Sequence, residues 1–332
     1  MKNYFFLLTI LLSTIFSTCK KKEFDVLTEN KNGCLFNHTE LAINYDTFFT
    51  MGCPVMFDAI HLNKYEYFDP VFNPNDKNEI AYVRKDTEFN SGWHDELWTF
   101  NFCTGETNFL TDKIGYDPDW SIKDWIIFTG KDRQIWKIKP SGDSLTQLTN
   151  QSGYSNHPKW NDTGNKFVYF NANSDKSLFL IADEFGFSKD TLPLFAAHWN
   201  WSANYILFSR GGGSSDVIFG VYDLETKDTI VIGSPPNNRI VGELNYIENK
   251  NSLLYNEQVI AYVNFDTKEE TKLLIEAANR IYGRMDLSSD DKTIIVTRTY
   301  RNKINSCTME VETSLYLVDI DGKNERRINF PE

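Results

Sequence analysis

Eight ionisable residues recur along this chain, each near the start of a segment rich in aromatic and β-branched residues. They are Asp69, Asp117, Asp119, His157, His198, Glu243, Arg284 and Asp286. Carboxylates and imidazoles that gather at one point can bind a cation, the basic end of a peptide or a sugar, and two carboxylates flanking a glycosidic bond can hydrolyse it. The strands and loops that position these eight residues decide which of these chemistries they can perform.

The segment Asp117–Thr149 shows what those elements are. It holds four short runs of aromatic and β-branched residues separated by turn-forming residues, which predicts four antiparallel strands, lettered a to d. The ionisable residues lie on strand a. One such sheet cannot bury both of its faces alone, so further copies should stack beside it.

Five further copies of the pattern are present. In each, an anchor residue on strand a precedes a strand b of I-x-F type, and successive anchors lie about 40–50 residues apart. The anchors and their strand-b residues are Phe72 with Ile80 and Tyr82, Trp120 with Ile126 and Phe128, Trp160 with Phe167 and Tyr169, Trp199 with Ile206 and Phe208, Leu244 with Leu253 and Tyr255, and Leu287 with Ile294 and Val296. This spacing is typical of propeller blades. The sequence therefore predicts an all-β fold, a six-bladed β-propeller of four-stranded antiparallel blades over residues 65–332, with a short N-terminal extension.

Motifs within the repeat resemble a known family. Pro118-Asp119-Trp120-Ser121, Pro158-Lys159-Trp160-Asn161 and the blade ending Gln147-Leu148-Thr149 are similar to the TolB-type, WD-like propeller repeat, roughly P-x-W-S-P-D-G-K-x-I-x-F followed by R-L-T. The P-D-G turn is altered here, and copies four to six lack the proline. The resemblance implies a six-bladed propeller that binds a protein or peptide partner in the cell envelope, but it implies no single activity.

In a blade of this kind the d–a and b–c loops lie on one face of the ring, and loops on a rigid scaffold are where binding sites collect. The predicted ligand-binding residues at the channel mouth and on this face are Trp93, His94, Asp117, His157, Glu243, Arg284, Asp286 and Arg301. Arg301 belongs to Tyr300–Lys303, which we interpret as a basic b–c loop of blade six. Alternatively, the channel residues only cap backbone amides or solvate the channel, and Trp93 packs on its own blade.

Residues 1–18 resemble the signal peptide of a bacterial lipoprotein. A positive start precedes the apolar run Tyr4–Phe16, which has the length of a secretory signal. It is too short to cross a bilayer, which takes about 20 residues. Cys19 is then the predicted lipidation site, and Lys20 after it favours the outer membrane, with the protein facing the periplasm or the cell surface. The alternative is an ordinary signal peptide followed by an incidental cysteine.

Residues 19–33 are rich in polar residues and predict a tether, whereas 34–64 predict a cap or an extra strand, with a seventh blade as the alternative. If Cys19 carries lipid, four cysteines are left to form disulfides in an oxidising compartment. They are Cys34, Cys53, Cys103 and Cys307. Cys103 lies at a c–d turn and Cys307 in a b–c loop, at opposite faces of the ring, so we slightly favour a Cys34–Cys53 pair.

Composition excludes some classes of function. With 34 Lys and Arg against 46 Asp and Glu, the formal net charge is −12, which argues against a nucleic-acid partner. The five histidines have no metal-ligand spacing, and the acidic turn Asp319–Glu325 lacks the distal glutamate of a calcium loop, so neither a metal nor a cofactor is expected. The chain also leaves no room for a separate hydrolase domain after the propeller.

The sequence therefore favours a lipid-anchored envelope propeller that acts as a non-catalytic scaffold for a protein or peptide. A glycan-binding envelope lipoprotein is the alternative. A lyase or hydrolase with its site in the channel is a third possibility. It requires two carboxylates, or a histidine and a carboxylate, within catalytic reach of each other beside a cleft.

Overall fold

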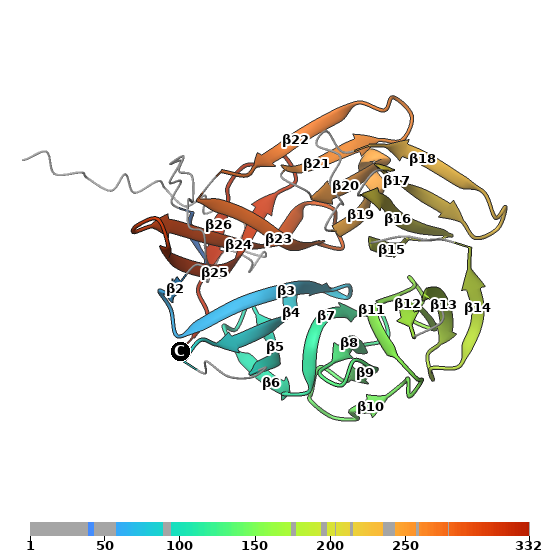
Figure 1. Ribbon diagram of the computed structural model, residues 1–332, viewed down its shortest axis with the longest axis horizontal. Helices are drawn as coiled ribbons and strands as arrows, with labels where there is room; N and C mark the ends of the chain where they lie inside the picture. Colours follow the sequence, from blue (N-terminus) through green and yellow to red (C-terminus); the bar gives the residue numbers. More distant parts are fainter. Residues whose placement is uncertain are drawn as a thin grey trace, which may run out of the picture. The chain divides into compact units, whose positions relative to one another are not determined.

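The six predicted blades are present and form a ring, which confirms the predicted fold (Figure 1). This computed structural model describes residues 39–42, 58–88, 94–173, 177–193, 198–202, 204–212, 215–234, 243–256, 259–277 and 279–331. All of these belong to one compact unit, Cys34–Glu332, whereas Met1–Gly33 forms a separate unit. The predicted signal peptide, Cys19 and Trp93 lie outside the described residues. Among the residues described, no helix is long and apolar enough to cross a membrane.

Each blade is built from four antiparallel strands that follow one another in the chain. Blade one contains β3 (Tyr65–Asn73), β4 (Asp76–Asp86), β5 (Asp95–Asn101) and β6 (Thr107–Thr111); blade two β7 (Ile114–Trp120), β8 (Ile126–Gly130), β9 (Ile135–Ile138) and β10 (Thr146–Gln147); blade three β11 (Tyr154–Trp160), β12 (Lys166–Ala172), β13 (Ser177–Asp183) and β14 (Ser188–Leu192). Blade four contains β15 (His198–Ser202), β16 (Tyr205–Gly212), β17 (Ser215–Asp223) and β18 (Thr229–Gly233); blade five β19 (Glu243–Ile247), β20 (Ser252–Asn256), β21 (Val259–Asn264) and β22 (Glu270–Ile275), with the 3-10 turn η2 (Glu248–Lys250) after β19; blade six β23 (Arg280–Leu287), β24 (Thr293–Lys303), β25 (Thr308–Asp319) and β26 (Arg326–Ile328).

Blade six also carries the described parts of residues 34–64. Strand β1 (Thr39–Leu41) pairs antiparallel with β26, and β2 (Asp58–His61) pairs parallel with β25. The first strands of neighbouring blades lie side by side, and β23 lies beside β3, so the ring closes between blade six and blade one (Figure 1).

A Ser or Asn side chain after the anchor fixes the turn from strand a to strand b. Ser121 Oγ accepts a hydrogen bond from the Trp125 amide at 3.1 Å, and Asn161 Oδ1 accepts one from the Lys166 amide at 3.0 Å. These short polar side chains satisfy amides that have no strand partner in the turn. Ser or Asn follows the observed anchor in five of the six blades, as Asn73, Ser121, Asn161, Ser202 and Ser288.

In blades four and five the anchor lies two residues later than the sequence pattern predicted. The residue opposite the first apolar position of strand b is Trp201 rather than Trp199, and Tyr246 rather than Leu244. Leu244 nevertheless lies on the core face of its strand, because side chains alternate with a period of two. Trp201 is buried in the core, whereas the side chain of Trp199 is outside the described set.

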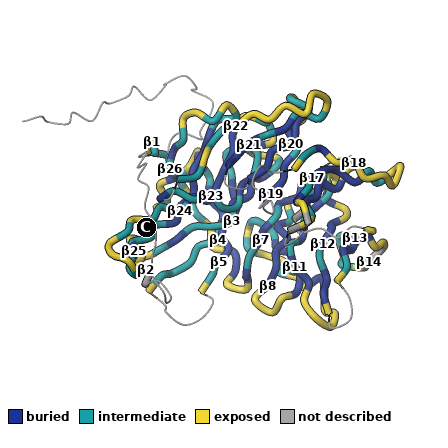
Figure 2. The backbone as a smooth tube through the Cα atoms, turned by 45° about the horizontal axis from the view of Figure 1, so that its top comes forward, coloured by how far each residue is buried: buried dark blue, intermediate teal, exposed yellow. Residues whose placement is uncertain are grey.

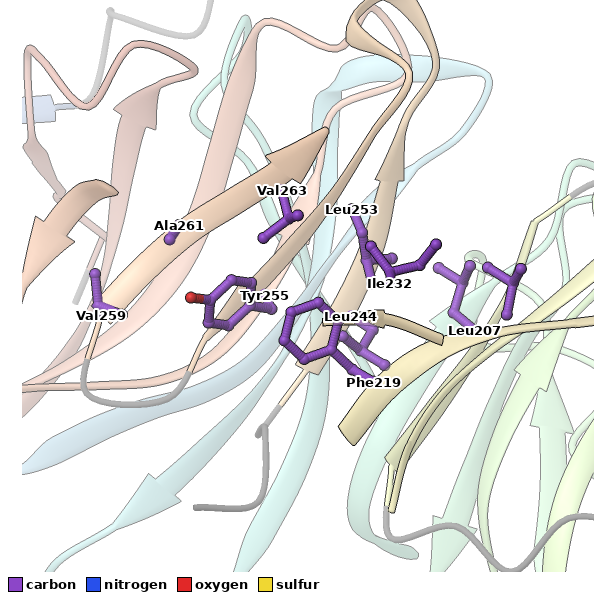
Figure 3. Packing of buried hydrophobic residues seen from close by; sticks show 10 residues of the cluster. Leu207, Phe219, Ile232, Leu244, Leu253, Tyr255, Val259, Ala261 and Val263 are labelled. Atoms are coloured by element: carbon purple, nitrogen blue, oxygen red, sulfur yellow. The ribbon is translucent and has the colours of Figure 1, made fainter. Parts of the chain in front are cut away.

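The core lies between the blades. Six clusters of buried hydrophobic residues are present, and each combines residues of two neighbouring blades. Figure 3 shows one of them, in which Leu207 and Phe219 of blade four pack with Leu244 and Tyr255 of blade five. Figure 2 shows the strands mostly buried and the connecting turns mostly exposed. Each sheet is therefore stabilised by its neighbours, as the stacking argument requires.

The strands of blade six run further than predicted. Strands β24 and β25 have 11 and 12 residues and pair along their whole length, from Thr293 opposite Asp319 to Lys303 opposite Met309. The interpretation of Tyr300–Lys303 as a loop is therefore wrong. All four residues of this stretch pair with residues of β25 and continue the strand.

Cys103, in the turn between β5 and β6, and Cys307, in the loop between β24 and β25, are both disulfide-bonded. The favoured Cys34–Cys53 pair concerns residues outside those that the structure describes. It stays a prediction.

Candidate functional site

The first strand of every blade carries an ionisable residue three positions before the observed anchor. These residues are Asp69, Asp117, His157, His198, Glu243 and Arg284. Four of them, from blades one, two, five and six, line a single cavity where the first strands meet. Together with His157, which contacts Asp117, the equivalent positions of five blades therefore build one cluster of charges.

Three of these positions are shaped by β-bulges. Asp69, Asp117 and His157 each precede a proline and adopt positive φ angles of 45°, 55° and 52°. The register between strands a and b shifts at the same places. Proline cannot donate a hydrogen bond to the ladder, Asp and His tolerate left-handed backbone better than most residues, and bulges redirect side chains. The Asp-Pro and His-Pro pairs are thus the local signal for this site.

Arg284 on β23 joins side chains from three other blades. Its Nη2 lies 2.6 Å from Asp117 Oδ1, and its Nη1 lies 2.5 Å from Glu243 Oε2. The same Nη2 lies 3.4 Å from His157 Nδ1, which also contacts Asp117 Oδ2. The carboxylates of Asp117 and Glu243 are almost fully buried, so Arg284 supplies the charge that keeps them ionised.

Lys159 on β11 is a second cationic centre. Its Nζ lies 3.2 Å from Glu243 Oε1 and 3.6 Å from Asp119 Oδ1. The sequence analysis did not select Lys159 as a site residue. The signal that could have found it is the residue just before the anchor, which is polar in five blades. Those residues are Asp119, Lys159, Asn200, Asn245 and Asp286.

Residues directly before the anchor form hydrogen bonds between neighbouring blades. Asp119 Oδ2 of blade two accepts a hydrogen bond from the Trp160 amide of blade three at 2.7 Å. Asp286 Oδ2 of blade six accepts one from the Phe72 amide of blade one at 2.8 Å. These carboxylates replace strand pairing between blades, where no ladder hydrogen bonds exist.

The carboxyl groups of this cluster fall into two groups, one with raised and one with lowered pKa values. Burial raises the pKa of Asp69 to about 6, with the charge of Asp117 adding to the shift. Burial likewise raises the pKa of Asp119 to about 6 and that of Asp286 to about 7, and the nearby Lys159 opposes both shifts. Three buried carboxyls therefore titrate near neutral pH.

The two carboxyls that contact Arg284 behave differently. Burial alone would raise the pKa of Asp117, but Arg284 and His157 outweigh burial and hold this pKa well below its usual range. For Glu243, Lys159 and Arg284 outweigh burial in the same way and lower the pKa. These two carboxylates stay charged at neutral pH.

The cluster leaves little space. The cavity has a volume of about 10 Å³, which is the room of about one water molecule. Within the ion pairs around Arg284, His157 and Arg284 are the more accessible side chains, at 30% and 25% exposure. The histidine and the carboxylate required by a channel enzyme do converge. The cleft that a substrate needs is not found at this cavity.

The structure thus brings together five of the predicted site residues, namely Asp117, His157, Glu243, Arg284 and Asp286. His94 directly precedes β5, and Arg301 lies within β24, where its amide donates to Asn279 O at 2.9 Å. Neither belongs to the cavity lining. Among the described residues, no group of three or more His, Cys, Asp or Glu side chains is arranged to hold a metal ion.

No protein-family profile matches this chain, and no curated protein matches its sequence. Solved structures do resemble its fold. A TolB-type structure from Agrobacterium tumefaciens is 13% identical with a TM-score of 0.56, and the match covers 69% of this chain and 86% of the other. The structure of a nidogen/laminin complex is 11% identical with a TM-score of 0.54, covering 80% and 93%.

TolB from Acinetobacter baumannii is also similar, at 15% identity and a TM-score of 0.45, covering 79% of this chain. The present chain spans about half of that protein, 54% of its length. At these identities the likeness concerns the fold, a TolB-type six-bladed β-propeller.

Proposed function

We propose that this protein is a non-catalytic propeller scaffold of the bacterial cell envelope, which binds a protein or peptide partner. The observation that carries the proposal is that little space is left at the channel mouth. Its charged side chains pair with one another across the ring, and the space left between them is about 10 Å³. A filled channel suits a scaffold that presents its outer surface, because a substrate pocket in a protein of this size typically has ~300 Å³ or more.

The propeller fold supports a binding role. It is rigid because buried clusters join every pair of neighbouring blades, and rigid scaffolds bind through loops at little cost in ordering entropy. The similar structure named above is that of a nidogen/laminin complex, so a protein of similar fold occurs there together with a protein partner. We extend the role, but not the identity of the partner, to this chain.

The partner site in this proposal is the face with the d–a and b–c loops. His157 and Arg284 offer their partly exposed side chains at the channel mouth. In the sequence, Trp93 and His94 lie between β4 and β5 of blade one, and Arg301 belongs to β24 of blade six, the neighbouring blade in the ring. Aromatic and arginine side chains are the residues that most often dominate protein interfaces. They are the first candidates for mutation.

Anchoring at the membrane is part of the same proposal. The apolar run Tyr4–Phe16, the cysteine at position 19 and the lysines after it support lipidation of Cys19. Two acyl chains hold a protein stably at a bilayer that it does not span. Lys20 favours the outer membrane, on either its periplasmic or its outer surface.

The test is brief crosslinking in cells that express the full chain with Cys19 intact, followed by purification and mass spectrometry. We expect one defined envelope protein to be enriched over cells without the chain. Recovery of glycan alone would move the proposal to sugar capture, and recovery of neither would contradict a scaffold role. Cys19→Ser is the matched variant, since it removes the lipid but leaves the propeller unchanged.

A further inference from the structure

The β24–β25 hairpin extends beyond its neighbour in the ring. Its strands have 11 and 12 residues, whereas β20 and β21 of blade five have 5 and 6. Near the ring, Tyr316 and Val318 of β25 pack against the core of blade five. Further along the same strand, Glu310 and Glu312 lie on the same face as Tyr316, beyond the reach of that core.

This extended face lines a pocket with a volume of about 320 Å³. That volume is within the range of ligand-binding pockets. The walls come from β24, β25 and β26, together with Leu41 and Ala42 at the end of β1 and Leu62 after β2. The pocket is far larger than the cavity at the channel mouth and shares none of its lining residues.

The cations of the pocket are already neutralised. Arg298 is 3% exposed, its Nη1 lies 3.1 Å from Glu325 Oε1, and its guanidinium lies 4.7 Å from the Tyr316 ring centre. Arg327 pairs with Glu312. An anionic ligand therefore finds no arginine here that lacks a carboxylate partner.

Two carboxylates of the pocket have no such partner. Glu310 accepts a hydrogen bond from Asn302 Nδ2 at 2.8 Å but forms no ion pair with the described residues, and neither does Glu40 on β1. The pocket thus carries uncompensated negative charge. It lies on a protein whose own net charge is −12, which attracts cationic ligands over a distance.

Apolar surface surrounds these carboxylates. Leu41 and Leu62 line the pocket and are 53% and 45% exposed, and Ile60 on β2 is 48% exposed. Tyr300 adds an aromatic side chain to the wall. Exposed apolar residues that gather beside a cavity mark a contact surface.

From this geometry we propose that the pocket between β1 and the β24–β25 hairpin binds a basic peptide segment in which Lys or Arg alternates with apolar residues. The long apolar stem of Lys or Arg lies along Tyr300 and Leu62, and its charged end reaches Glu310 and Glu40. Apolar neighbours of the basic residue cover Leu41 and Ile60. The inference rests on the proposed function, since it names the chemistry of the partner.

The experiment measures fluorescence anisotropy of three labelled peptides with the full chain. One alternates leucine with lysine, one leucine with glutamine, and one leucine with glutamate. We expect the lysine peptide to bind at least about fivefold more tightly than the other two, and the difference to shrink as salt screens the charges. Equal binding of all three peptides, or no binding of the lysine peptide, would overturn the proposal.

Variants locate the site. The double variant Glu40→Gln and Glu310→Gln should weaken the lysine peptide by about fivefold and leave the glutamine peptide unaffected. Tyr300→Ala should weaken both peptides. The matched control is Glu106→Gln with Glu225→Gln, two exposed glutamates of blades one and four, and equal loss in this control would contradict the assignment. Thermal unfolding verifies that every variant folds.

This experiment is separable from the crosslinking test. If crosslinking recovers a protein partner but the peptides do not differ, the pocket assignment fails and the scaffold function stands. If the lysine peptide binds but cells yield no partner, the pocket stands and the scaffold function fails.

Discussion

Asp286 of β23 accepts a hydrogen bond from the backbone amide of Phe72 on β3, at 2.8 Å, although 214 residues separate them in the chain. This bond crosses the junction between the last blade and the first. Both β23–β26 and β3–β6 are complete blades from consecutive segments of the chain, so no shared sheet joins them. Side-chain contacts therefore join the two blades, beside the backbone pairing of β1 and β2, which precede blade one, with β26 and β25 of blade six. The side-chain contacts should contribute measurably to the stability of the ring.

Removing the closing carboxylate should destabilise the ring. Asp286→Ala leaves the Phe72 amide buried without its acceptor, which costs about 1–3 kcal/mol of the free energy of unfolding. Urea denaturation followed by circular dichroism measures this loss. The matched control is Asp290→Ala, which removes the more exposed pair of Lys77 and Asp290 across the same junction and should cost about 1 kcal/mol or less. Equal losses would contradict a special role for Asp286.

Phe330 should be a second closing contact. Its ring lies 4.2 Å from that of Tyr67, 4.6 Å from Tyr82 and 5.2 Å from Phe100, measured between ring centres. Phe330 follows the last strand of blade six, and the other three rings belong to blade one. We expect Phe330→Ala to lower the free energy of unfolding by about 2 kcal/mol. Phe187→Ala is the control, since that side chain is 69% exposed and its loss should change little.

The channel carboxyls predict a pH dependence of stability with a definite sign. Burial raises the pKa of Asp69 and Asp119 to about 6 and that of Asp286 to about 7, so the folded state binds more protons than the unfolded state between about pH 4 and 7. Their contribution to stability is therefore greatest at acidic pH and is lost as the pH rises toward 7. Asp286→Asn mimics the protonated form. The free energy of unfolding of this variant, relative to that of the wild type, should therefore rise as the pH is raised from 5 to 8.

Urea denaturation at the two pH values measures the effect in both proteins. A difference between variant and wild type that is the same at pH 5 and pH 8 would show that the pKa of Asp286 is not raised. Asp321→Asn serves as the control. Asp321 lies in an exposed turn where Lys323 lowers its pKa.

Arg284 should be required for the stability of the folded protein, because it neutralises the buried carboxylates of Asp117 and Glu243. Arg284→Met leaves Asp117 and Glu243 buried without their nearest cation, which costs on the order of 3–5 kcal/mol. Adding Asp117→Asn and Glu243→Gln removes the stranded charges and should restore much of the loss. The measurement is the midpoint temperature of thermal unfolding of Arg284→Met and of the triple variant. A triple variant less stable than Arg284→Met would contradict this account of the cluster.

The ring and its charged mouth could be predicted from the sequence because both depend on local periodicity. Trp120 and Trp160 recur at blade spacing, and Asp117 and His157 lie at the same distance before them. Even the misplaced anchor Leu244 lies in the core, because the error was two residues and side chains alternate with a period of two.

Other features depend on tertiary contacts that a single repeat does not encode. Lys159 looks like any exposed lysine until Glu243, two blades away, is brought within 3.2 Å of it. Tyr300–Lys303 is rich in polar residues and resembles a loop, yet it pairs with β25 because that strand extends alongside it. The first contact joins different blades and exists only in the assembled ring, and the second depends on the length of the partner strand.

We propose that this propeller binds an envelope protein through the face of its d–a and b–c loops. The most direct test is to compare partner recovery after crosslinking in cells between the wild type, the face variant Trp93→Ala with Arg301→Glu, and the control Lys123→Ala, which lies at an a–b turn on the other face. The account predicts that one protein is recovered with the wild type and with the control, and is lost with the face variant. Recovery that is equal with all three chains, or no recovered protein at all, would contradict it.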